Sequence, residues 1–237
     1  MVKEVLKAGD KIEIRILQQS DKIYRSTIYD ILDNDEVEIG MPMEKGKMAV
    51  LSLNLLYELE FFGENGVYRC TAQVIERYKR DNLYALRIEL KSQLKKIQRR
   101  EYYRFECAVD MDYMMITQEE AEMPIEKVEA HHRHDYPEDA IKHAVALDLS
   151  GGGIRFTSDE LEERSGCVFV KMALKNETMD RQFQMVGRLL RSKRLETDRE
   201  KYEHRTQFLQ IDARTREQII KYIFDEERKN RNRGKGR

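Results

Sequence analysis

Short runs of alternating apolar and polar side chains dominate the first ninety residues of the chain. Between Lys11 and Leu17, Ile12, Ile14 and Ile16 would share one face, which is the period of a half-buried strand. Five similar runs follow, at Ile23–Leu32, Glu36–Met41, Leu53–Phe62, Val67–Tyr78 and Leu83–Leu90. Short strands at regular spacing, separated by Asn-, Asp- and Gly-rich turns, predict a small antiparallel barrel or sandwich.

The second half of the chain shows the same period. It predicts strands at Tyr103–Tyr113, Lys142–Leu149, Gly153–Ser158, Cys167–Leu174, Phe183–Lys193 and Glu203–Ile211. The helical spacing of Ile219, Ile220, Ile223 and Phe224 then predicts an amphipathic helix at Thr215–Asn230. The expected fold is mostly β, with two small antiparallel β-barrels in tandem and a C-terminal α-helix.

Two stretches interrupt the strand pattern. Lys91–Arg100 is polar, basic and without alternation, so we place an inter-domain linker there. Met114–Asp139 is acidic and contains Pro124 and Pro137. We interpret this second stretch as an excursion from the barrel with a short helix at Glu119–Ala130.

Composition narrows the class of protein. The net charge of −1 argues against a general nucleic-acid binder, and no apolar run is long enough to span a membrane. The N-terminus lacks the apolar core of a secretion signal, and the three cysteines are odd in number and widely spaced. We therefore expect a cytoplasmic protein without a disulfide framework.

Candidate chemistry is concentrated in two clusters, and the first is rich in arginine. Arg99, Arg100 and Arg104 lie within six positions at the predicted junction between domains. Arginine forms bidentate contacts to phosphate and to the O6/N7 edge of guanine, and its plane can stack on a base. By itself, however, an arginine-rich linker is more often a solvated hinge.

The second cluster is Asp148-Leu149-Ser150-Gly151-Gly152-Gly153, directly after a predicted strand. If Ile141, His143, Val145, Leu147 and Leu149 face the core, Asp148 and Ser150 share the outer face. A carboxylate can accept from the N1–H and N2–H₂ edge of guanine, and glycine lets backbone approach a ligand closely. Such a turn alone is also typical of an ordinary hairpin.

The two clusters together resemble a known family. Arg100-x-x-x-Arg104, preceded by Arg99, and Asp148-x-Ser150-x-x-Gly153 are similar to the RxxxR and DxSxxG signature of PilZ domains, which bind cyclic di-GMP. The N-terminal part resembles the partner domain of two-domain flagellar-brake proteins. The acidic excursion at Met114–Asp139 departs from a minimal domain of this family.

The resemblance implies a division of the chain and a ligand site. Residues 1–94 would form a flagellar-brake-type, split-barrel-like domain, 95–104 the linker with the RxxxR motif, 105–230 the PilZ domain and 231–237 a basic tail. Arg100 and Arg104 would hold guanine edges and phosphates, with Arg99 adding a phosphate contact or a stacking surface. Asp148 and Ser150 would contact a second guanine edge, and Gly153 would keep the turn open.

The resemblance also implies a function. Cyclic di-GMP would change the geometry between the domains, and the chain would regulate the flagellar motor through stator or switch proteins, with recruitment to the basal body. The alternatives are a cyclic di-GMP receptor that controls exopolysaccharide synthesis or secretion, and a structural adaptor that works without ligand.

Other chemistry is not expected. The sequence has no nucleophile–base pair or phosphate loop with catalytic spacing, so we expect no enzyme and no cofactor besides the ligand. His131-His132-Arg133-His134 has no matching Cys or carboxylate spacing, so we interpret it as solvated histidines in a loop rather than a metal site.

Overall fold

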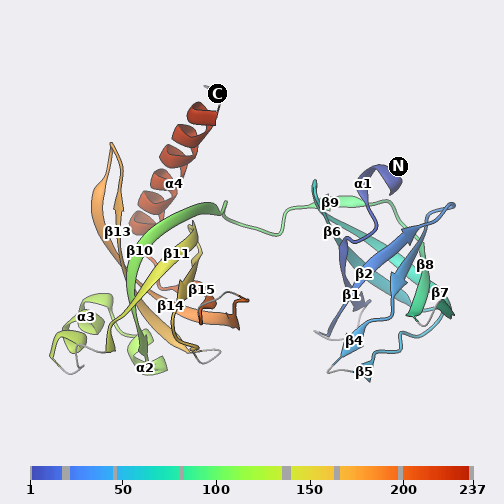
Figure 1. Ribbon diagram of the computed structural model, residues 1–237, viewed down its shortest axis with the longest axis horizontal. Helices are drawn as coiled ribbons and strands as arrows, with labels where there is room; N and C mark the ends of the chain where they lie inside the picture. The colour runs from blue at the N-terminus through green and yellow to red at the C-terminus, as the bar shows by residue number, and fades with distance from the viewer. Residues whose placement is uncertain are drawn as a thin grey trace. The chain divides into compact units, whose positions relative to one another are not determined.

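The computed structural model describes residues 2–17, 22–44, 47–80, 83–134, 140–162, 166–196 and 200–234 of the 237-residue chain. The chain divides into two compact units, Met1–Arg100 and Glu101–Arg237. Each unit contains a barrel of antiparallel strands with its own buried core (Figure 1). The expectation of two β-barrels in tandem followed by a helix is therefore confirmed.

Six strands of the first unit form a ring in the order β6-β1-β2-β3-β8-β7, which the pairing of β6 with β7 closes. Its elements are α1 (Val2–Val5), β1 (Lys11–Ile16), β2 (Ile23–Ile31), β3 (Glu36–Gly40), β4 (Met43–Glu44), β5 (Lys47–Met48), β6 (Leu56–Gly63), β7 (Gly66–Arg80), β8 (Leu83–Leu90) and β9 (Lys95–Ile97). Ile12 and Ile14 are fully buried in its core, as the alternation in the sequence predicts.

Strand β9 departs from the sequence analysis, which assigns residues 95–97 to the linker. These residues pair with Val67–Arg69 at the start of β7. The pairing arises because β7 is 15 residues long and its first part, bonded to β6 on one side, presents a free edge on the other. Local alternation in the sequence does not reveal such an edge.

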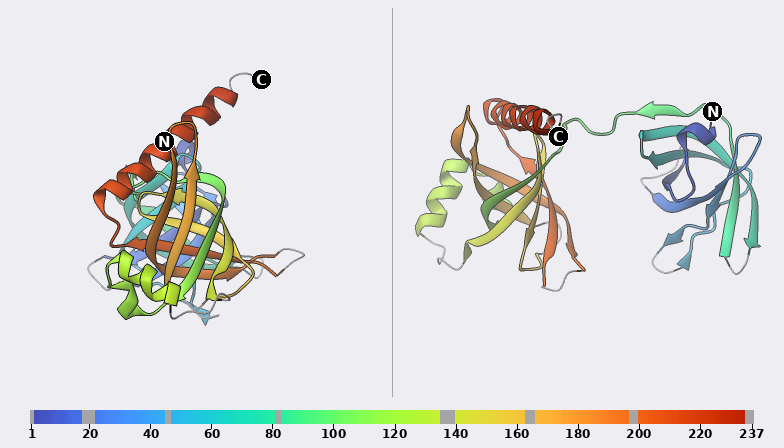
Figure 2. Two further views of the ribbon diagram at one scale, coloured as in Figure 1. Left: turned by 90° about the vertical axis from the view of Figure 1, so that its left-hand side faces the viewer. Right: turned by 45° about the horizontal axis from the view of Figure 1, so that its top comes forward.

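The second unit is a closed barrel with the strand order β10-β11-β12-β15-β14-β13. Its strands are β10 (Phe105–Ile116), β11 (Lys142–Ser150), β12 (Gly153–Ser158), β13 (Cys167–Lys175), β14 (Asp180–Arg194) and β15 (Tyr202–Leu209). The two views in Figure 2 show these strands around a common interior. Phe156 and Val170 are among the fully buried side chains of the core.

Helix α4 (Ala213–Gly234) packs against one end of this barrel (Figures 1 and 2). Ile219, Tyr222 and Ile223 are buried in the same cluster as the barrel core, whereas Phe224 remains 58% exposed. The predicted amphipathic helix is thus present, but Tyr222 rather than Phe224 completes its buried face. The helix also continues to Gly234, into the part of the chain that the sequence assigns to a basic tail.

The acidic excursion begins with an extension of β10 to Ile116, followed by helices α2 (Gln118–Ala121) and α3 (Ile125–His134). Two short helices thus replace the single one expected at Glu119–Ala130, because Pro124 stands just before the first turn of α3. Val128 of α3 packs with Phe169 of β13 in a cluster separate from the barrel core. His131 lies within α3 rather than in a loop, and the side chains of residues 132–134 lie outside the described ones.

The inward face of β11 also differs from the expectation. Ala144 and Ala146 are buried, while Ile141, His143 and Val145 are exposed, opposite to the predicted orientation. The reason is an irregularity in the pairing with β12 between Ala146 and Asp148, where Leu147 is the extra residue. A bulge shifts the alternation of inward and outward side chains by one position. Ala146 and Leu149 are therefore both buried, although residues three apart on a regular strand face opposite sides.

No helix among the described residues is long and apolar enough to span a membrane. Cys70, Cys107 and Cys167 are free thiols.

Candidate functional site

The turn between β11 and β12 is organised by the Ser150 hydroxyl. This hydroxyl donates to the Gly153 carbonyl at 3.1 Å and accepts from the Gly152 amide at 3.3 Å. Ser150 is 7% exposed, so its oxygen lies at the base of the turn. The turn is therefore held in one shape by the side chain that the sequence marks as a ligand contact.

Gly153 begins β12 at a place where no side chain fits. A Cβ at this position would lie 2.2 Å from the Thr206 carbonyl oxygen of β15. That neighbour is backbone within a paired strand, so it cannot move aside without separating the two strands. Only glycine, which has no Cβ, therefore fits at this position.

Asp148 lies on β11, two residues before Ser150, and its carboxylate already has a partner. Its Oδ2 accepts from Arg155 Nε at 2.5 Å, and Arg155 Nη1 donates to Glu203 at 3.0 Å. The hydrogen bond to Asp148 is the main reason that the pKa of Arg155 is raised. Burial raises the pKa of Glu203, but the guanidinium groups of Arg155 and Arg205 outweigh it and lower that pKa overall. The Asp148 carboxylate is thus fixed in orientation by a neighbouring cation.

Tyr102, which lies inside the arginine motif, packs on this turn. It is the middle residue of Arg100-x-x-x-Arg104, and its Cδ1 and Cδ2 atoms lie 2.7 and 3.0 Å from where Cβ atoms would be on Gly151 and Gly152. The Arg216 guanidinium of α4 lies 5.4 Å from the same ring, at cation–π distance. The segment that leads to Arg104 therefore packs directly on the Asp-x-Ser turn.

The structure places the three predicted arginines differently. Arg104 is exposed in the second unit, next to Phe105 at the start of β10. Arg100 is exposed at the end of the first unit, where its carbonyl accepts from Gln98 Nε2 at 2.9 Å.

Arg99 packs on the first barrel. Its Nη1 lies 3.3 Å from a Glu13 oxygen and 3.1 Å from a Glu60 oxygen, and its guanidinium lies 5.1 Å from the Phe62 ring. Burial raises the pKa of the Glu60 carboxyl, but the positive charges of Arg15, Arg69 and Arg99 outweigh this effect and hold that pKa below its usual value. Arg99 is therefore occupied by carboxylates of the first unit.

Sequence reasoning missed three side chains of this region: Tyr102, Arg155 and Arg216. Tyr102 could have been noticed because it stands inside the arginine motif. Arg155 follows Gly153 by two positions and so shares its face of β12, but its pairing with Asp148 depends on strand register. Arg216 is brought to Tyr102 by the packing of α4, which no local pattern encodes.

Both halves of the chain match known protein families. Residues 98–225 match the PilZ domain, and residues 7–90 match PilZNR, described as flagellar protein YcgR. The chain belongs to the PilZ family. Because the second match covers the N-terminal unit, this PilZ protein has the two-domain organisation of the flagellar-brake type, as the sequence analysis expects.

Solved structures share this organisation. The structure of Bacillus subtilis inhibitor of motility (MotI/DgrA) has a TM-score of 0.74 at 19% identity, covering 95% of this chain and 100% of that one. Escherichia coli YcgR in complex with c-di-GMP has a TM-score of 0.52 at 14% identity, covering 99% of this chain and 91% of that one. At these identities the likeness shows a common fold. Comparison with curated proteins gives no match.

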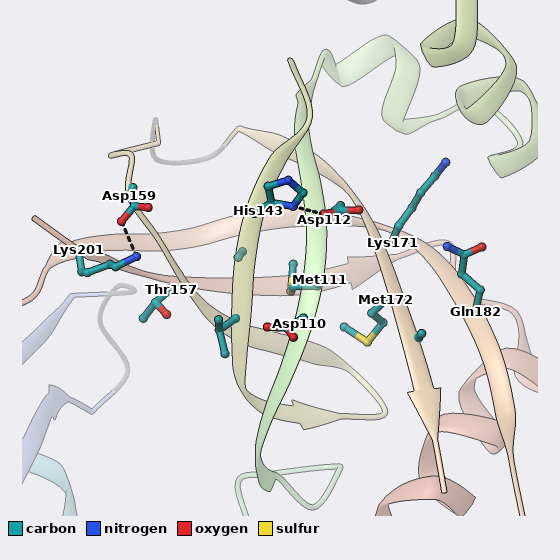
Figure 3. Close-up of a pocket in the computed structure, with 13 residues that line it drawn as sticks. Asp110, Met111, Asp112, His143, Thr157, Asp159, Lys171, Met172, Gln182 and Lys201 are labelled. Atoms are coloured by element: carbon teal, nitrogen blue, oxygen red, sulfur yellow. Dashed lines mark hydrogen bonds and ion pairs between the residues drawn. The ribbon is translucent and has the colours of Figure 1, made fainter. Parts of the chain in front are cut away.

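The PilZ barrel also has a groove of about 510 Å³ on its side, away from the Asp-x-Ser turn. Figure 3 shows His143 and Asp112 facing each other there, with their ring and carboxylate 2.6 Å apart, and an Asp159–Lys201 ion pair. Asp110 adds a further carboxylate, and this mixed lining is unfavourable for a ligand that carries phosphates. Among the described residues, no group of His, Cys, Asp or Glu is arranged to hold a metal ion.

Proposed function

We propose that this PilZ protein is a cyclic di-GMP receptor that regulates flagellar motility by a change in the geometry between its two domains. The observation that carries the proposal is the packing of Tyr102 on the Gly151–Gly152 turn. This contact supports a site that includes Arg104, because Tyr102 and Arg104 belong to the same unit as the Asp-x-Ser-x-x-Gly motif. Membership in the PilZ family, and the c-di-GMP bound by Escherichia coli YcgR in its complex, support cyclic di-GMP as the ligand.

The roles of the site residues follow from their chemistry. Arg104 and Arg100 are exposed guanidinium groups that can form bidentate contacts with guanine edges and phosphates. Asp148 offers Oδ1, since Oδ2 is bonded to Arg155, and Ser150 lines the base of the turn. Gly153 allows β15 to lie close to β12 beside this turn. Ligand binding is the activity we assign, not catalysis.

The conformational step concerns Arg99. In the structure this residue is bonded to Glu13 and Glu60 of the first unit. A ligand phosphate at Arg99 would compete with these two carboxylates for the guanidinium group. A ligand changes a conformational equilibrium only through its different affinity for the two states. We propose that exchange of Glu60 for ligand phosphate at Arg99 supplies this difference.

The partner in this proposal is a protein of the flagellar motor, either of the stator or of the switch. The match of the N-terminal unit to flagellar protein YcgR and the fold shared with an inhibitor of motility support it. Swimming of cells that carry or lack the chain, compared with and without a cyclic di-GMP synthase, tests this step. A chain that alters polysaccharide output but leaves swimming unchanged would contradict the motor assignment.

Calorimetric titration of the full chain with cyclic di-GMP, and with cyclic di-AMP as a control, tests the ligand. We expect Arg104→Ala to weaken cyclic di-GMP binding by about 1–3 kcal/mol, the scale of a bidentate arginine–guanine contact. Arg100→Lys should also weaken it, because an ammonium group cannot reproduce the guanidinium fork. No binding by the unaltered chain, or equal affinity for adenine and guanine ligands, would overturn the assignment.

Distances between spin labels on the two units, measured with and without ligand, test the change in geometry separately. Identical distance distributions with and without ligand would contradict the change in geometry but not the assignment as a cyclic di-GMP receptor.

A further inference from the structure

Arginines line up across three strands beside Asp148. Strand register makes Asp148 the partner of Arg155, Arg155 the partner of Arg205, and Arg205 the partner of Arg191. These residues stand on β11, β12, β15 and β14 in turn. Directly opposed residues in antiparallel strands share a face, with Cβ atoms about 4.5–5.5 Å apart. We call Arg155, Arg205 and Arg191 the arginine row.

The next row on this face contains little bulk and one more cation. Ser150 is opposite Gly153, Gly153 opposite Gln207, and Gln207 opposite Arg188. Gly153 carries no side chain, and the Thr206 carbonyl oxygen of β15 fills the space where its Cβ would lie. The arginine row is therefore continuous with the Asp-x-Ser-x-x-Gly turn, with no bulky side chain between them.

The charges of the arginine row are only partly neutralised. Glu203 is bonded to Arg155 at 3.0 Å and to Arg205 at 3.1 Å. Arg191 and Arg188 are exposed and have no carboxylate partner in the part of the chain that the structure describes. Like charges directly opposite one another destabilise a sheet, so a row of this kind is favoured by a bound anion.

We propose that the arginine row binds a phosphodiester of the ligand and extends the site from Asp148 across β12 and β15. This inference rests on the proposed function. Three inter-strand spacings separate Asp148 from Arg191, about 14 Å, so a ligand with one base at Asp148 can place a phosphate over the row. Guanidinium groups match phosphate oxygens bidentately, and those of Arg205 and Arg191 lie at the surface.

Titration of the full chain with cyclic di-GMP tests the row through Arg205→Gln and Arg191→Gln. Each variant should weaken binding by about tenfold or more, the smaller end of what a charge-assisted hydrogen bond contributes. Arg181→Gln is the matched control, since it removes the same charge from an exposed position ten residues earlier on β14. It should bind within about twofold of the unaltered chain, a difference far below one charge-assisted bond.

Thermal unfolding without ligand separates binding from folding. Arg191→Gln should leave the melting temperature unchanged or raise it, because it removes a like-charge opposition and no ion pair. Normal affinity in both variants, while the unaltered chain binds cyclic di-GMP, would overturn the arginine row and leave the proposed function intact. An equal loss of affinity in the Arg181→Gln control would show that the effect is general charge attraction, and this result would also overturn the arginine row. If the unaltered chain does not bind, the proposed function itself fails.

Discussion

The substitution Gly153→Ala tests the closeness of β12 and β15 at the Asp-x-Ser turn. The added Cβ would lie 2.2 Å from the Thr206 carbonyl oxygen, whereas ordinary contacts begin at 3.4 Å. The strands must therefore separate by roughly 1 Å at this point, because the obstacle is backbone. A shift of that size also breaks the hydrogen bond from the Phe208 amide to the Gly152 carbonyl, now 3.0 Å long.

The cost follows from these two changes. Overpacking of this kind costs about 1–3 kcal/mol, and the lost hydrogen bond adds about 1 kcal/mol. For a unit of this size, about 2–4 kcal/mol corresponds to a fall of roughly 6–20 °C in melting temperature. The cyclic di-GMP affinity should fall as well, because the backbone surface beside Ser150 moves.

Scanning calorimetry of the full chain measures this effect, with the transition of the N-terminal barrel as an internal reference. Gly152→Ala is the control, since its Cβ would meet only Tyr102 ring atoms, at 3.0 and 3.3 Å. A side chain can move aside, so we expect this variant to lose less than about 1 kcal/mol. A Gly153→Ala variant that unfolds at the temperature of the unaltered chain would refute the argument from space.

Two further predictions concern the N-terminal barrel and the interior of the PilZ barrel. Glu13→Gln removes one carboxylate from Arg99. If Arg99 exchanges its carboxylate partners for ligand phosphate, affinity for cyclic di-GMP should rise by up to about fivefold, the value of a weak ion pair, and a decrease in titration would contradict this. His204 is fully buried, and burial lowers its pKa below 6.5. Below pH 6.5 the unfolded chain binds a proton that the folded chain excludes, so stability should fall by up to about 1.4 kcal/mol per pH unit. Urea unfolding at pH 7.5 and 5.5 should show a smaller difference for His204→Gln than for the unaltered chain or the exposed His143→Gln, and equal differences in all three would contradict the prediction.

The strands could be predicted from the sequence wherever alternation is unbroken. Ile12 and Ile14 are buried as predicted, and Gly153–Ser158 forms β12 with the predicted bounds. The prediction from alternation is wrong on β11. An extra residue at Leu147 turns Val145 and His143 outward, whereas the sequence pattern predicts that they face the core. A bulge is a property of two paired strands, so one strand's pattern does not contain it.

The candidate site likewise has local features that the sequence predicts and contacts that it does not predict. Residue types and their spacing, namely an arginine motif at the domain junction and an Asp-x-Ser-x-x-Gly motif after a strand, could be identified without the structure. Side-chain chemistry and the period of a strand suffice for that, because both are local. Three contacts required the folded structure: Tyr102 on the Gly151–Gly152 turn, Arg155 with Asp148, and Arg99 with Glu60. These contacts join residues on different strands or distant segments, and their geometry depends on strand register and on how the barrels close.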